Sequence, residues 1–268
     1  MYVLFDVGGT KTRIAVSKNG EGFGEPKIFS TPQSFDEGIS LIIGAGKELL
    51  NGERATVVAG GIAGPLNLKK TKLVNSPNLP GWIQKPLHKE LFKAFGAPVF
   101  LENDTALVGL GETHYGKGQG HKIVVYMTFS TGVGGARYVN GKIDANTFGF
   151  EPGHQYIEGT KKDLDALVSG KGIESIYGVT PENITDARIW EEITEKMAIG
   201  VHNTLVMWSP EIIILGGGLI QHAVKIESIK AGLDKILKIF PNSPKLEGCV
   251  LGSTGGLFGA LVFAKQNL

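Results

Sequence analysis

One pattern occurs in both halves of the chain: a short apolar run, a glycine turn, a second apolar run and an Asn-Gly pair. The first copy spans residues 2–20 and the second spans residues 123–141. The runs are short and rich in β-branched and aromatic residues, so they predict strands, and each Asn-Gly pair predicts a hairpin turn. Two copies of one hairpin predict a duplicated fold whose two glycine turns face each other across a cleft.

The first glycine turn, Gly8-Gly9-Thr10-Lys11, follows Asp6 at the end of a predicted strand. Backbone N–H groups converge on anions where side chains are missing, and Asp6 is placed to hold a hydrated magnesium ion there. An ordinary glycine hairpin is the alternative, and the second copy of the pattern favours the phosphate site. The chain has no P-loop pattern, and its glycines lead into a strand rather than into the helix that a dinucleotide fingerprint needs.

Composition limits the classes of protein that remain. The chain has 268 residues, of which 42% are hydrophobic, enough for a buried core and two domains. A net charge of +1 with scattered Lys and Arg gives no basic patch for nucleic acid. The single cysteine, Cys249, excludes an internal disulfide and a cysteine-based zinc cluster. No apolar run approaches the ~18 residues of a membrane span, and the first residues already form a strand, so we expect a cytoplasmic protein without membrane partners.

Two polar segments of the first half are candidates for ligand binding. Glu102-Asn103-Asp104 follows a predicted strand at residues 98–101 and opens a helix that runs to about Tyr115. Ligands of open α/β sheets lie beyond such strand ends, so Asp104 is a candidate general base, while helix capping is the commoner use of an Asp there. In the segment 75–82, proline and glycine forbid regular structure, and Trp82 fits a sugar-facing loop or the core equally well.

The second half carries a Glu-x-x-His pair, Glu151 and His154. On a helix this pair would share a face and could bind a metal, but Pro152-Gly153 disfavours a helix and favours hydrogen bonding to a polyol. A solvated helix acid is the default interpretation of Asp165 from the residues alone. Glycines 216–218 end a predicted strand and leave room for an adenosine. Helices are predicted at residues 35–50, 87–95, 163–168, 187–208, 224–240 and 255–265.

In this order, seven segments resemble the glucokinase-type branch of the ROK family of sugar kinases, in the actin-like ATPase superfamily. They are Asp6-Val7-Gly8-Gly9-Thr10-Lys11, Asn78-Leu79-Pro80-Gly81-Trp82, Glu102-Asn103-Asp104, Thr131-Gly132-Val133-Gly134-Gly135, Glu151-Pro152-Gly153-His154, Ser169-Gly170-Lys171-Gly172 and Leu215-Gly216-Gly217-Gly218. The resemblance implies an α/β fold of two ribonuclease-H-like domains with ATP and sugar in the cleft between them. The domains are expected at residues 1–116 and 117–254, with a last helix at about 255–268 returning to the first.

The resemblance also implies roles for residues in an ATP- and magnesium-dependent hexose kinase, with a glucose-like hexose as the first expectation. Asp104 would accept the proton of the sugar hydroxyl. The implied sugar-binding residues are Asn103, Glu151 and His154, with Gly64 and Asn78 beside them. The implied nucleotide-binding residues are Asp6, Gly8, Gly9, Thr10, Lys11, Thr131, Gly132, Gly216, Gly217 and Gly218.

The chain departs from the family at a zinc loop, which is missing, and at the sugar-binding Glu that follows it. Asp165 stands in place of this Glu, and the resemblance implies that it too binds the sugar. We therefore expect no zinc and looser hexose selectivity. Two alternatives remain, namely a sugar sensor without catalysis and another actin-like ATPase. Sugar-responsive repressors of the family carry a helix-turn-helix before the first strand, which this sequence lacks. A homodimer is left open by the sequence.

Overall fold

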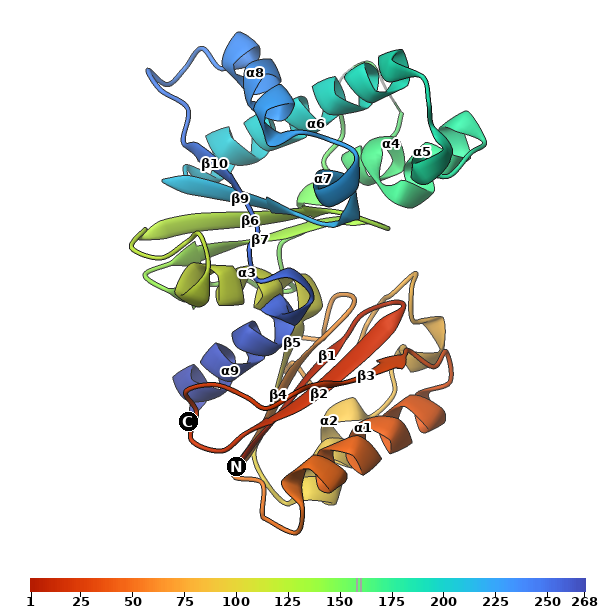
Figure 1. Cartoon of the computed structure of the whole chain (residues 1–268), viewed down its shortest axis with the longest axis vertical. Helices are drawn as coiled ribbons and strands as arrows, with labels where there is room; N and C mark the ends of the chain where they lie inside the picture. The colour runs from red at the N-terminus through yellow and green to blue at the C-terminus, as the bar shows by residue number, and fades with distance from the viewer. Residues whose placement is uncertain (158, 160) are drawn as a thin grey trace. The chain divides into compact units, whose positions relative to one another are not determined.

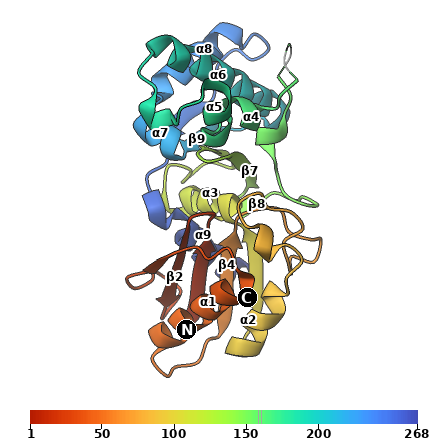
Figure 2. The ribbon, with the colours of Figure 1, turned by 90° about the vertical axis from the view of Figure 1, so that its right-hand side faces the viewer.

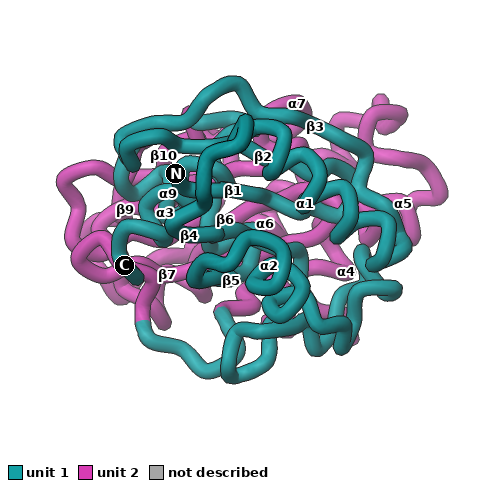
Figure 3. Tube along the Cα trace, turned by 90° about the horizontal axis from the view of Figure 1, so that it is seen from below, with its two compact units in different colours: residues 1–115, 145–149, 251–268 teal, residues 116–144, 150–250 magenta. Residues whose placement is uncertain are grey.

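The computed structural model describes residues 1–157, 159 and 161–268. The chain divides into two compact units, coloured separately in Figure 3. The first unit consists of residues 1–115, 145–149 and 251–268, and the second consists of residues 116–144 and 150–250. Each unit is built around one mixed five-stranded sheet.

The sheet of the first unit has the order β3-β2-β1-β4-β5. Its strands are β1 (Tyr2–Val7), β2 (Lys11–Ser17), β3 (Lys27–Ser30), β4 (Val57–Ile62) and β5 (Val99–Asn103). Strands β1, β2 and β3 pair antiparallel, whereas β1, β4 and β5 pair parallel. Helices therefore cover both faces of the central strands, and the side chains of β4 are all buried.

Figure 1 shows α1 (Phe35–Leu50) and α2 (Leu87–Phe95) on one face of this sheet, with α9 (Gly255–Asn267) on the other. Helix α9 packs along α3 (Asp104–Tyr115) and against β1 and β4. Close contact between the two helices depends on small residues. A β-carbon at Gly111 would lie 2.5 Å from the Gly255 carbonyl oxygen, and one at Gly259 would overlap the Leu107 carbonyl. Two short 3-10 helices, η1 (Pro80–Trp82) and η4 (Gly252–Thr254), complete the unit.

The sheet of the second unit has the order β10-β9-β6-β7-β8, which repeats the plan of the first. Its strands are β6 (Ile123–Phe129), β7 (Val133–Val139), β8 (Lys142–Ile143), β9 (Ile212–Gly216) and β10 (Lys245–Gly248). Its helices are η2 (Pro152–His154), α4 (Leu164–Val168), α5 (Gly170–Tyr177), η3 (Pro181–Asn183), α6 (Ala187–Trp208), α7 (Gly218–His222) and α8 (Ile226–Ile236). Helices α4 to α8 gather over one face of the sheet (Figures 1 and 2). The predicted duplication of the hairpin is confirmed.

Most predicted elements are present, and the differences have local causes. The predicted bounds of α1, α2 and α6 are confirmed. Helix α8 ends at Ile236 instead of Phe240, since Leu237 is extended and Pro241 follows soon after. Helix α5 was not predicted because its two glycines weaken the helical signal, although Ser169 caps it by accepting a 3.0 Å hydrogen bond from the Gly172 N–H.

The structure also decides the position of Trp82, which belongs to the core. Its side chain is 2% exposed, and its Nε1 donates a 3.0 Å hydrogen bond to the Pro32 carbonyl. Its ring meets Phe35 edge-on and lies directly against Gly38. Within the part of the chain that the structure describes, no helix combines the length and the apolarity that a bilayer span requires.

We predict that Gly259→Ala lowers the stability of the protein by about 3 kcal/mol, because the added methyl group must displace the backbone of α3. Gly44→Ala is the matched control, since Gly44 is an exposed residue inside α1 with open space around it. That control should raise stability by about 0.5–1 kcal/mol. Urea unfolding of both variants measures the difference, and equal stability of the two would contradict the packing argument.

Candidate functional site

Two carboxylates of the first unit lie at the ends of β1 and β5, the strands on either side of β4. Asp6 is the next-to-last residue of β1, and Asp104 is the first residue of α3, directly after β5. A glycine makes room for each of them: a β-carbon at Gly61 would lie 2.8 Å from the Asp104 Cα, and one at Gly256 would lie 2.6 Å from the Asp6 Cγ. Neither glycine was among the predicted site residues, although the pair Gly60-Gly61 is visible in the sequence.

Burial of this pair changes its acid–base behaviour. Burial raises the pKa of Asp6 to about 7, with a further upward contribution from the charge of Asp104 and a downward one from Arg13. The Arg13 guanidinium lies opposite Asp6 in the β1–β2 register, with Nη1 3.5 Å from Oδ2. Burial also raises the pKa of Asp104 to about 6, against the lowering effect of hydrogen bonds from Thr105. Both carboxyl groups therefore change charge near neutral pH.

Capping of α3 belongs to Asn103, so the interpretation of Asp104 as the helix cap is wrong. The Asn103 Oδ1 accepts a 3.0 Å hydrogen bond from the Ala106 N–H, as an N-cap residue does. The Asn103 Nδ2 donates to the Gly64 carbonyl over 3.3 Å, and this bond connects two of the predicted sugar-binding residues. Asp104 accepts hydrogen bonds on Oδ1 from the N–H and the hydroxyl of Thr105.

The first glycine turn is held by a threonine that the sequence did not indicate. The Thr31 hydroxyl donates a 2.8 Å hydrogen bond to the Gly8 carbonyl, and the Thr31 N–H donates to the Thr10 carbonyl over 2.9 Å. The Gly8 N–H donates to the Lys11 carbonyl, which closes the turn. A β-carbon at Gly9 would lie 2.8 Å from the Asn78 Cβ, so the predicted phosphate turn and the predicted sugar loop are in contact.

The second glycine turn, residues 130–133, is fixed by neighbouring helices of its own unit. The Ser130 carbonyl accepts a 2.7 Å hydrogen bond from the Gly170 N–H at the start of α5, and the Ser130 N–H donates to the Gly132 carbonyl over 2.9 Å. The Val133 N–H donates to the Asp165 Oδ1 over 2.6 Å. The default interpretation of Asp165 as a solvated helix acid is therefore wrong, since its half-buried carboxylate holds the turn.

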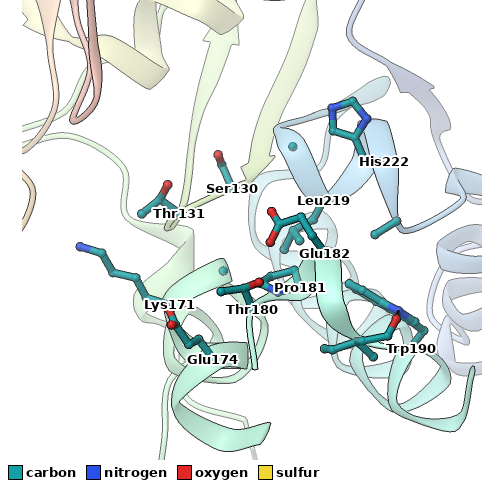
Figure 4. Close-up of a pocket in the computed structure, with 14 residues that line it drawn as sticks. Ser130, Thr131, Lys171, Glu174, Thr180, Pro181, Glu182, Trp190, Leu219 and His222 are labelled. Carbon is teal, nitrogen blue, oxygen red and sulfur yellow. Dashed lines mark hydrogen bonds between the residues drawn. The ribbon is translucent and has the colours of Figure 1, made fainter. Parts of the chain in front are cut away.

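A cavity of about 670 Å³ in the second unit borders this turn (Figure 4). Three helices and the segment around η3 form its wall, with the residues Ser130, Thr131, Gly170, Lys171, Glu174, Thr180, Pro181, Glu182, Ile184, Trp190, Gly218, Leu219, His222 and Ala223. Of the predicted nucleotide residues, Thr131 and Gly218 line it. Gly216 and Gly217 instead shape the end of β9: a β-carbon on Gly216 would overlap the Tyr126 hydroxyl, and Gly217 has a φ of 92°. Sequence reasoning did not predict that α5, α6 and η3 contribute to the wall of this cavity. The only sequence signal for this wall was the segment Ser169-Gly170-Lys171-Gly172 at the start of α5.

The turn that carries Glu151 and His154 forms the short helix η2, too short to place the two side chains as a helical metal pair. His154 bonds to a different carboxylate: its Nδ1 lies 2.8 Å from the Asp163 Oδ2. The Asp163 Oδ1 accepts from the Ala166 N–H over 2.9 Å and so caps α4. The hydrogen bond to Asp163 raises the pKa of His154, although partial burial opposes this. Among the described residues, no three His, Cys, Asp or Glu side chains are grouped to hold a metal ion.

We predict that the His154–Asp163 bond stabilises the protein most at acidic pH. Because the folded-state pKa of His154 is raised above its ordinary value, the contribution is complete below pH ~6.5 and disappears as the pH rises through the folded-state pKa. The melting temperature of His154→Gln should therefore fall furthest below that of the wild type near pH 5.5 and approach it by pH 9. His88→Gln, on α2 of the other unit, is the control. A difference that grows with pH would contradict the assignment.

Comparisons with known proteins agree with this geometry. The model of the ROK family matches residues 2–267. A glucokinase of Thermotoga maritima is 29% identical over 266 residues, which cover 82% of this chain and 83% of the relative. The structure of a ROK hexokinase from Thermus thermophilus has a TM-score of 0.88 and 26% identity, and covers 99% of this chain and 98% of its own.

A second solved structure has the same fold at lower identity. It is a ROK family glucokinase from Streptomyces griseus in complex with glucose and AMPPNP, with a TM-score of 0.82, 23% identity and 99% of both chains covered. The two mixed sheets thus have the actin-like ATPase fold of the ROK sugar kinases. Since the family model spans residues 2–267, the chain belongs to the ROK family.

Proposed function

We propose that this protein is a sugar kinase that transfers the γ-phosphoryl group of ATP to a hydroxyl group of a glucose-like hexose. The single observation that supports this proposal most directly is the Asp104 carboxylate, a partly buried group at the end of β5 with a pKa raised to about 6. Such a group is ionised at neutral pH and still basic enough to accept a proton from an attacking hydroxyl. Membership of the ROK family makes phosphoryl transfer to a sugar the reaction class that fits it.

Asp104 acts as the general base in this proposal. Phosphoryl transfer asks a protein mainly for positioning and for stabilisation of charge, and a base adds about 10²–10⁴-fold. Gly61 lets the backbone of Asp104 pack closely on β4, and the Thr105 N–H fixes Oδ1 from 2.8 Å. This arrangement orients the carboxylate before the substrate binds, so that little reorganisation is needed during the reaction.

Magnesium fits the same strand ends. Asp6 and Asp104 are like charges in a buried setting, and the charge of Asp104 adds to the raised pKa of Asp6. Carboxylate oxygens are the protein ligands that magnesium prefers, and it usually keeps several waters, so Asp6 would hold it through water. When bound, the ion would neutralise charge on the phosphates. Arg13 offsets part of the negative charge at Asp6 from 3.5 Å.

The cavity of the second unit fits a nucleoside better than a bare polyphosphate chain. Its wall combines the apolar side chains of Ile184, Trp190 and Leu219 with the backbone turn at Ser130 and Thr131 (Figure 4). Flat aromatic and aliphatic surfaces suit a base and a ribose, whereas a polyphosphate would be expected to need mainly cationic walls. The Streptomyces griseus glucokinase was crystallised with the ATP analogue AMPPNP, which supports the same donor here.

The proposed sugar ligands are polar side chains from later segments of the chain, outside the two glycine turns. Asn78 and Asn103 come from the first unit, where Gly64 connects with Asn103 through a hydrogen bond. Glu151 and His154 come from the second unit, where Asp163 orients the imidazole of His154. Hydroxyl groups of a hexose are recognised by such carboxylates, amides and imidazoles. The proposal includes a magnesium-dependent, zinc-independent activity, because only one cysteine is present in the sequence.

We predict that Asp104→Asn lowers kcat by about 10²–10⁴-fold and leaves the dissociation constant of the sugar within about threefold. The Asn Oδ1 can still accept from Thr105, and loss of a buried charge beside Asp6 should keep the melting temperature at or above that of the wild type. Asp36→Asn, an exposed acid in the first turn of α1, is the control. Turnover near the wild-type rate in the folded Asp104→Asn variant would exclude Asp104 as the general base.

A panel of hexoses tests the activity itself. Purified protein with ATP and magnesium should phosphorylate glucose, with appreciable rates on mannose and fructose, and a zinc-selective chelator should leave the rates unchanged. Removal of magnesium should abolish them. Sugar binding without turnover would identify a sensor, and sugar-independent ATP hydrolysis would identify another ATPase. Strict preference for glucose over mannose and fructose would contradict the expectation that this protein selects less strictly among hexoses.

A further inference from the structure

The carboxylate of Asp165 is directed at the backbone of the second glycine turn. We propose that Asp165 is a positioning residue that sets the conformation of the turn 130–133, and that it is not a sugar ligand. The inference deepens the proposed function, because this turn borders the cavity assigned above to the nucleotide. It also differs from the role that the family resemblance implies for this position, which is that of a sugar-binding acid.

The geometry of the contact is tight and specific. Asp165 is the second residue of α4, and its Oδ1 accepts a 2.6 Å hydrogen bond from the N–H of Val133, the first residue of β7. A hydrogen bond to an ionised acceptor is shorter and stronger than one between neutral groups. A β-carbon on Gly132 would lie 3.2 Å from the same Oδ1, a tight contact that would push the carboxylate away from its present position.

Other bonds leave the turn little freedom. The Gly170 N–H at the start of α5 donates to the Ser130 carbonyl over 2.7 Å, and the Ser130 N–H donates to the Gly132 carbonyl. Asp165 therefore fixes the end of the turn at β7, while α5 fixes its beginning. The turn residues that line the cavity are Ser130, which carries the first attachment, and Thr131, which lies between the two (Figure 4). A shift of Val133 would be transmitted to them through two peptide units.

The length of the side chain explains why an Asp fits here. The Oδ1 atom already lies 2.6 Å from the Val133 nitrogen, so an added methylene would drive a Glu carboxylate into the turn or turn it away. A Glu at this position could reach further toward a ligand but would lose the bond to Val133. An Asp, one methylene shorter than the Glu of the family, thus reaches less far toward a ligand but holds the turn in place.

Three substitutions separate a positioning role from a ligand role. Asp165→Asn keeps an oxygen acceptor, Asp165→Ala removes it, and Asp165→Glu displaces it. Glu195→Gln, an exposed acid on α6, is the control. Calorimetry measures the dissociation constants of AMPPNP and of glucose separately, and amide hydrogen exchange reports the protection of residues 130–135 without any need for activity.

We expect Asp165→Asn to bind both ligands within about threefold of the wild type. Asp165→Ala and Asp165→Glu should weaken AMPPNP binding about tenfold, leave glucose binding within about threefold, and speed exchange at Val133. If Asp165→Ala does not fold, the comparison of the Asn and Glu variants decides the same question.

Two results would overturn the inference. One is a loss of glucose affinity in both the Asn and the Ala variants with AMPPNP binding unchanged, which would make Asp165 a sugar ligand. The other is unchanged exchange at Val133 in Asp165→Ala or Asp165→Glu. A wild-type protein that binds neither AMPPNP nor glucose would refute the proposed function alone, since the exchange measurement would still test the bond between Asp165 and Val133.

Discussion

The parallel pairing of β1, β4 and β5 is the constraint on which the first unit depends. In this register Asp6 lies beside Gly61, and Gly61 lies beside Glu102, so the polar ends of three strands meet at one edge of the sheet. Because the central position is a glycine, the backbone of Asp104 packs against β4 with no side chain between them. A larger residue at position 61 would push Asp104 away from β4 and from Asp6, whose pKa is raised first by burial and then by the charge of Asp104.

The second unit repeats this plan of strands but fixes its glycine turn by different chemistry. In the first unit the hydroxyl and the N–H of Thr31 hold the turn. In the second unit a carboxylate from α4 and an N–H from α5 do so. The difference follows from the surroundings, because β3 runs beside the first turn, whereas helices lie beside the second. A duplicated backbone therefore carries two independent solutions to the same problem of holding a glycine-rich turn still.

Side-chain hydrogen bonds hold the turn at residues 151–155 in place. The Gln155 Nε2 donates to the Pro152 carbonyl over 2.8 Å and to the Gly200 carbonyl of α6 over 3.2 Å. The bond between His154 and Asp163 connects the same turn with the start of α4. The side chains of Gln155 and His154 therefore attach the turn to α6 and to the start of α4. The orientation of His154 thus depends on a carboxylate, which makes it sensitive to pH.

The sequence by itself determined the main helices and strands and where along the chain the candidate functional residues lie. Hairpin turns, helix bounds such as those of α1 and α6, and the position of Asp104 after a strand all follow from signals within a few residues. Only the tertiary structure decided that Trp82 is core, that Asp165 binds the Val133 N–H, and that Trp190 shares a cavity with Thr131. The physical reason is that each of these facts depends on segments tens of residues apart. Periodicity and turn propensity act along the chain, whereas burial, pKa and side-chain partners depend on which segments folding brings together.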